Sequence, residues 1–209
     1  MKHTKRNHLF SAILLGAMSM ASPLMAQVGK VTVDKPSFDD LQSPQVGGNT
    51  DKKNFRPKDW LEMEVRFSVE MPSSYKEAFV DSVTVKWYVA IDDPRGGRKK
   101  VYLEKEIKHV NVPVGEEIYS SVYLSPAAVL RISGSETAGK RVVTAVGGEI
   151  LVNGAAAHNN SGFFTSAGKP KWWDHQDISS YNKIPLLNKY ETPFKFLWWD
   201  RYAEIEEPK

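Results

Sequence analysis

Strict alternation of apolar and polar residues is the feature that most constrains the fold of this chain. In the stretch that follows Lys58, the apolar positions are Leu61, Met63, Val65, Phe67 and Val69, and the polar positions are Glu62, Glu64, Arg66, Ser68 and Glu70. A second stretch, 81–91, places Val83, Val85, Trp87, Val89 and Ile91 on one face. Because successive side chains of a β-strand point to opposite faces, each stretch predicts a strand with one buried face.

Shorter signals predict the remaining elements. Residues 92–97 (DDPRGG) combine a proline with two glycines and predict a hairpin turn before a returning strand at 100–112. Further strand-like runs lie at 28–33, 116–124, 141–146, 149–152 and 193–199. The pair Gly147-Gly148 predicts a bulge or a tight hairpin. Ser125 followed by Pro126 predicts a short helix near 126–131.

Together these elements predict an all-β fold. About seven strands, no long helices alternating with them and no repeat of fixed period are typical of an antiparallel, immunoglobulin-like β-sandwich. Trp87, in the middle of its strand, is expected between the two sheets. Residues 36–57 and 154–188 lack clear periodicity, so we expect long loops there within a single domain, 27–209.

Residues 1–26 predict a secretory signal peptide that is removed from the mature protein. Three basic residues precede an apolar run at 9–20, and Ala26 offers a small residue at the cleavage site. Cleavage after Ala21 or an uncleaved anchor are the alternatives, but the run is shorter than the roughly 20 residues that span a bilayer. We therefore expect a periplasmic or secreted protein with no transmembrane segment after processing. Association with the outer membrane is a further alternative for its location.

Removing this peptide changes the net charge, and the chain contains no cysteine that could form a disulfide in the exported domain. The whole chain has 28 Lys and Arg against 25 Asp and Glu, and the three basic residues of the signal peptide account for the difference. A neutral mature protein gives no reason to expect nucleic-acid binding. The local basic run at 95–100 lies in the predicted hairpin turn and is interpreted as a solvated loop.

A search for catalytic chemistry finds one cluster, at residues 172–177 (WWDHQD). Asp174, His175 and Asp177 offer two carboxylates and an imidazole. However, a transition metal usually needs three or four ligands fixed in space, and neighbours in an extended loop point in different directions. We interpret the segment as a loop packed through its tryptophans, and we expect no enzyme activity, no cofactor and no metal.

Tryptophan pairs are the more informative feature. Four of the six tryptophans are Trp172, Trp173, Trp198 and Trp199. In a strand, one member of the pair at 198–199 enters the core while the other faces outward. The outward ring is expected to bind a protein partner, to stack on a sugar ring or to pack beneath the loop 154–188. These four tryptophans are the candidate binding residues.

Two segments resemble a known family. Residues 192–202 (TPFKFLWWDRY) and 55–62 (FRPKDWLE), with the strand after the latter, resemble small secreted verrucomicrobial proteins encoded beside type IV pilus assembly genes. The resemblance implies an immunoglobulin-like sandwich, no known enzymatic activity and a role with pilus or secretion machinery. We therefore expect a non-enzymatic exported protein that contacts envelope or pilus assembly proteins. A carbohydrate-binding module that uses exposed tryptophans is the alternative.

Overall fold

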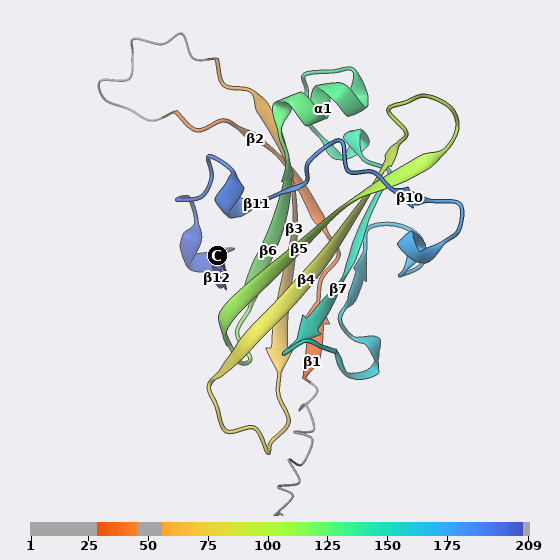
Figure 1. Ribbon diagram of the computed structural model, residues 1–209. Coiled ribbons are helices and arrows are strands. Elements are labelled where there is room, and N and C mark those ends of the chain that lie inside the picture. Colours follow the sequence, from red (N-terminus) through yellow and green to blue (C-terminus); the bar gives the residue numbers. More distant parts are fainter. Residues whose placement is uncertain (1–28, 46–55, 207–209) are drawn as a thin grey trace, which may run out of the picture.

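The computed structural model describes residues 29–45 and 56–206, which form two facing β-sheets (Figure 1). The predicted signal peptide, 1–26, lies outside the described residues. The first sheet, sheet A, has the order β1-β3-β6-β11, with β2 also paired to β3. Its strands are β1 (Lys30–Val33), β2 (Ser37–Gln42), β3 (Asp59–Glu70), β6 (Ile118–Leu124) and β11 (Leu187–Asn188).

The second sheet, sheet B, has the order β10-β5-β4-β7-β8, with β12 paired to β5 and β9 paired to β7. Its strands are β4 (Phe79–Asp92), β5 (Lys100–Pro113), β7 (Ala145–Val152), β8 (Ala155–Ala156), β9 (Phe163–Thr165), β10 (Ser179–Ser180) and β12 (Glu204–Ile205). All pairings between these strands are antiparallel except that of β10 with β5. The prediction of an all-β sandwich is confirmed.

The alternating apolar residues form the core as predicted. Every apolar residue of that set in β3 and β4 is almost completely buried, and Trp87 lies between the sheets. Its indole N–H donates to Ser120 Oγ at 3.3 Å, and His109 Nε2 lies 3.0 Å from the same oxygen. Burial lowers the pKa of His109 to about 4, so the ring is neutral above that pH.

Helical structure is confined to the ends of strands and to connections. The helix α1 (Pro126–Ser133) lies at one end of the sandwich, where the sequence predicts it (Figure 1). Ser125 caps its first turn and Gly134, with φ of 70°, ends it. Single 3₁₀ turns are η1 (Lys140–Val142), η2 (His158–Asn160), η3 (Trp172–Asp174), η4 (Lys189–Glu191) and η5 (Trp199–Arg201). Among the described residues, no helix combines the length and apolar character needed to span a membrane.

Three local predictions are corrected. The described residues form twelve strands rather than about seven, because β2 falls within 36–57, four short strands fall within 154–188 and β12 follows the last predicted strand. Strands of two or three residues pair through their backbone and leave no side-chain alternation to detect. Residues 145–152 form one continuous strand, so Gly147 and Gly148 mark neither a bulge nor a hairpin. Residues 193–199 form turns instead of a last strand, because anchors at both ends hold the segment on sheet A.

Candidate functional site

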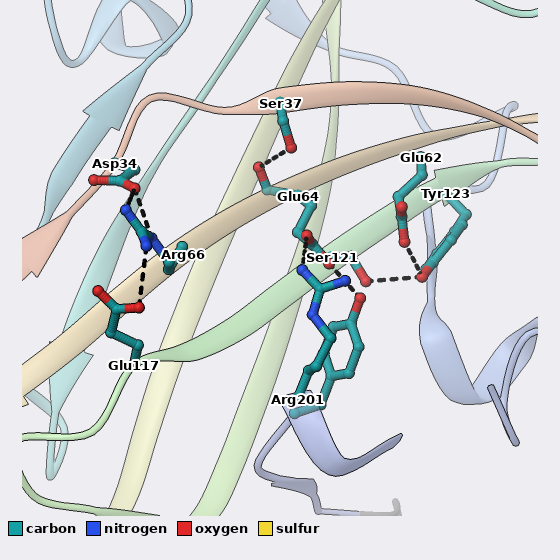
Figure 2. Close-up of polar contacts among 10 residues, drawn as sticks. Asp34, Ser37, Glu62, Glu64, Arg66, Glu117, Ser121, Tyr123 and Arg201 are labelled. Carbon is teal, nitrogen blue, oxygen red and sulfur yellow. Dashed lines mark hydrogen bonds and ion pairs between the residues drawn. The ribbon is translucent and has the colours of Figure 1, made fainter. Parts of the chain in front are cut away.

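Two glutamates on the outer face of sheet A are buried. The alternation of β3 points Glu62 and Glu64 away from the core, yet their exposed fractions are only 6% and 8%. Residues 189–202, which we call the C-terminal cover, supply two side chains that bind the Glu64 carboxylate, whereas Glu62 is bonded by Tyr123 of β6 (Figure 2). Further along the same face, where the strand is open to solvent, Arg66 pairs with Asp34 at 2.7 Å. The cover therefore converts one half of a solvent face into a buried polar cluster.

The Glu62 carboxylate accepts a hydrogen bond from the hydroxyl of Tyr123, the neighbour across the strand pair. Ser121 Oγ donates to the same tyrosine oxygen at 2.9 Å. Burial raises the pKa of Glu62 to about 7, even though the hydrogen bond from Tyr123 favours the charged form. Glu62 therefore takes up a proton more readily than an exposed glutamate does.

Glu64 connects β3 to the C-terminal cover directly. Arg201 Nη2 lies 3.0 Å from Glu64 Oε1, and the Tyr202 hydroxyl donates to Glu64 Oε2 (Figure 2). The Arg201 guanidinium also lies 3.9 Å from the ring centroid of Tyr119, which adds a cation–π contact. These contacts fix the last part of the cover on the sheet, because a carboxylate with so little exposure needs charged and hydrogen-bonding partners.

Lys189 completes the cluster from the start of the cover. Its side chain is 1% exposed, and among the described residues its Nζ has no hydrogen-bond partner. The ammonium lies 3.6 Å from the ring centroid of Tyr202 and is attracted by Glu62 and Glu64. Burial lowers the pKa of Lys189 to about 8. The cluster thus combines two basic side chains, Lys189 and Arg201, with two acidic ones, Glu62 and Glu64, beneath the C-terminal cover.

Apolar and backbone contacts strengthen the same attachment. Phe194 is fully buried, stacks on Tyr123 at 5.6 Å and meets Trp60 edge-on at 5.7 Å. At the start of the cover, Asn188 and Glu191 form a reciprocal capping box around η4. The cover is therefore held on both sides of the turn between residues 194 and 201.

That turn presents three aromatic side chains to solvent. The exposed fractions are 81% for Phe196, 48% for Trp198 and 69% for Trp199, and we call these three residues the aromatic loop. The sequence predicts that one ring of the Trp198–Trp199 pair enters the core, and this is wrong because both lie outside. Trp198 has φ of 51°, in the left-handed region that a bulky residue rarely adopts.

The other tryptophan pair lies on the outer face of sheet B. Trp173 is buried and stacks on Tyr88 at 4.6 Å, so it is not a surface aromatic, whereas Trp172 is half-buried. Gly147 makes room for both rings, since a Cβ there would lie 2.8 Å from Trp173 and 3.0 Å from the indole nitrogen of Trp172. The structure does not bring this pair to the aromatic loop.

The residues beside that pair do not gather a metal site. His175 Nδ1 lies 3.7 Å from Asp177 Oδ2, and both side chains are largely exposed. In the ranges 29–45 and 56–206, no three His, Asp or Glu side chains lie close enough to hold an ion together.

The two facing sheets, the helix at one end and the anchored aromatic loop define a class of small β-sandwich protein. A protein-family model matches residues 22–209, and the chain belongs to that family. A protein of Akkermansia muciniphila with a known crystal structure is 39% identical, with a TM-score of 0.79. The match covers 87% of this chain and 95% of that one, and it confirms the resemblance to verrucomicrobial proteins. A comparison with curated proteins finds no match.

Sequence reasoning places Glu62 and Glu64 on the correct face but misses their burial. One signal in the sequence could have indicated this burial. Two residues able to bind carboxylates, Arg201 and Tyr202, lie side by side at the end of an otherwise aromatic segment. Nothing in the local sequence assigns those groups to β3, which lies more than a hundred residues away.

Proposed function

We propose that this is an exported, non-enzymatic protein that acts by binding another protein through the aromatic loop. The observation that carries the proposal is the exposure of Phe196, Trp198 and Trp199 on a turn that is fixed to sheet A on both sides. Tryptophan is enriched among the residues that contribute most to protein interfaces. Exposed rings of this size are costly in water, and a partner that covers them recovers apolar burial.

Prior ordering of the turn favours such binding. Association loses affinity when a flexible loop must be immobilised, so a loop that is already fixed binds with a smaller entropic cost. Phe194 on one side and Arg201 on the other hold the aromatic loop in place before any partner arrives. The left-handed backbone at Trp198 supports the same interpretation, because strained conformations cluster at functional sites.

The partner we propose is a component of the type IV pilus or secretion machinery of the cell envelope. This finer assignment follows from the resemblance of residues 192–202 and 55–62 to secreted proteins encoded beside pilus assembly genes. The same resemblance supports describing the sandwich as immunoglobulin-like. The predicted signal peptide, 1–26, supports a location outside the cytoplasm. The aromatic loop falls within the first of these segments.

Affinity capture from envelope extracts tests the proposal. The full chain is expected to retain pilus assembly proteins, identified by mass spectrometry, and Phe196→Ser with Trp199→Ser is expected to lose them. The matched control is Phe79→Ser, since Phe79 is also a half-exposed aromatic residue and lies at the start of β4, outside the cover. Capture that lacks pilus proteins, or capture that survives the double substitution, would contradict the proposal.

A further inference from the structure

A second surface lies on sheet B, where two segments that are distant in sequence form the walls of one groove. The β4–β5 hairpin contributes one wall, and residues 172–179 contribute the other. The groove has a volume of about 850 Å³, within the range of natural ligand sites. None of the three residues of the aromatic loop lines it.

The hairpin wall is basic. Its cations are Arg95, Arg98, Lys99 and Lys100, and the whole lining contains only two carboxylates, Asp93 and Asp177. Arg95 is held in place by Asp93, with 2.7 Å between Nη2 and Oδ2, and it lies over the ring of Tyr181. No ion pair within the described residues uses Arg98 or Lys100. These two cations are therefore available to bind an anionic ligand.

The opposite wall and the floor suit a ligand with rings and hydroxyl groups. Trp172 adds aromatic surface to the wall, beside the polar side chains of Gln176 and Ser179. In the floor, Ala90 lies across the strand pair from Ala145, and two small side chains leave space above the sheet. Aromatic surface next to donors and acceptors is the combination that sugar rings require.

An extended peptide fits this place less well. Peptides often bind by adding a strand to a free sheet edge. Here that edge is occupied, because Ser179 of β10 pairs with Val101 of β5 at the groove. Side chains, and not a free strand edge, are therefore left to recognise the ligand.

We infer that this groove binds an acidic saccharide, with its carboxylate or sulfate groups on the basic wall and a sugar ring against Trp172. Arg98 and Lys100 supply the charge, and Thr144 and Gln176 are placed to hydrogen-bond hydroxyl groups. Charge-assisted hydrogen bonds to carboxylate and sulfate are stronger than neutral ones. The inference does not rest on the aromatic loop, so either proposal can fail alone.

Titration of the full chain with polysaccharides of known charge tests the inference. Tryptophan fluorescence and calorimetry are followed with polygalacturonate, heparin, neutral dextran and poly-L-glutamate. Polygalacturonate or heparin is expected to bind and to change the fluorescence, and dextran is not. The variant Arg98→Glu with Lys100→Glu is expected to weaken that binding by about tenfold or more.

The matched control is Lys35→Glu with Lys76→Glu, which alters net charge equally at two exposed lysines that do not line the groove. This control is expected to change the affinity by less than about twofold. Equal weakening by both double variants would show diffuse attraction and overturn the inference. Tighter binding of poly-L-glutamate than of either acidic saccharide, or no binding of the saccharides, would overturn it as well.

Discussion

The backbone at Trp198 is an unusual place for a large side chain. Its φ of 51° puts a bulky residue where glycine and asparagine are common, and this costs on the order of 1–3 kcal/mol. Trp199, the next residue, begins η5 and has no positive φ. The two neighbouring tryptophans therefore differ in backbone strain while both are exposed, and this makes them a natural comparison.

Trp198→Asn is expected to raise the free energy of unfolding by about 1 kcal/mol, because asparagine tolerates the left-handed region. The same change is expected to weaken partner binding, since it removes a ring of the aromatic loop. Urea denaturation measures the first effect and affinity capture the second. Trp199→Asn is the control, and it should weaken binding without any gain in stability. Equal unfolding midpoints for the two variants would contradict the role of strain.

At the scale of elements, the two glycines of β7 show how a strand can be shaped by what packs on it. A Cβ on Gly148 would lie 2.1 Å from the carbonyl oxygen of Lys86 and 2.4 Å from the ring of Phe164. Phe164 in turn meets Trp87 at 5.0 Å. The absence of a side chain at Gly148 thus lets an aromatic residue from β9 reach the sheet.

Gly148→Ala is expected to destabilise the protein by about 3 kcal/mol, at the upper end of what overpacking usually costs. The backbone carbonyl of Lys86 cannot move away without disturbing the ladder between β4 and β7. Gly96→Ala is the comparison, because nothing lies within 4 Å of its Cβ position and only its φ of 93° opposes the change. Urea denaturation should place Gly148→Ala well below Gly96→Ala, and the reverse order would refute the explanation.

Elements with their own periodic signal are the ones that sequence predicts well. β3 and β4 are long, alternate strictly and bury the residues expected, and α1 carries its own cap. Short strands such as β10 and β11 depend on a neighbouring strand, so local sequence contains little trace of them. The turn at 193–199 is aromatic like a strand, but its shape is set by contacts with β3 and β6 that only the folded chain reveals.

The functional surfaces likewise depend on contacts between distant segments, which local sequence does not show. The exposed tryptophans are visible in the sequence as a pair, although their shared exposure is not. The sequence does not predict the groove on sheet B. Taken alone, the basic run at 95–100 is interpreted as a solvated loop and the segment at 172–177 as a packed loop. Only the fold brings the two to one place.

At the scale of the whole molecule, two buried groups give opposite dependence on pH. The pKa of Glu62 is raised from 4.5 to about 7, so stability falls as pH rises through this window, where the unfolded chain releases a proton that the folded chain keeps. The pKa of His109 is lowered from 6.5 to about 4, so stability rises with pH between those values. Between about pH 4.5 and 6.5 the two effects oppose each other.

Glu62→Gln is therefore expected to expose the effect of His109. Over the shared window the free energy of unfolding should rise with pH by about 1.4 kcal/mol per unit, whereas the parent protein changes little. His109→Gln should slope the other way, as the effect of Glu62 then acts alone. Denaturation in urea at several pH values measures both slopes. Parallel profiles for the two variants would contradict the opposing roles.

The distribution of the tryptophans has a practical consequence for experiments on this protein. Trp87 is sealed between the sheets, while Trp198 and Trp199 lie in water. Emission from the sealed indole is shifted to the blue and protected from acrylamide, and emission from the two outer indoles is shifted to the red and readily quenched. One sample thus carries one optical signal for unfolding of the sandwich and a second, quenchable signal for changes around the exposed indoles, and both can be followed without any added label.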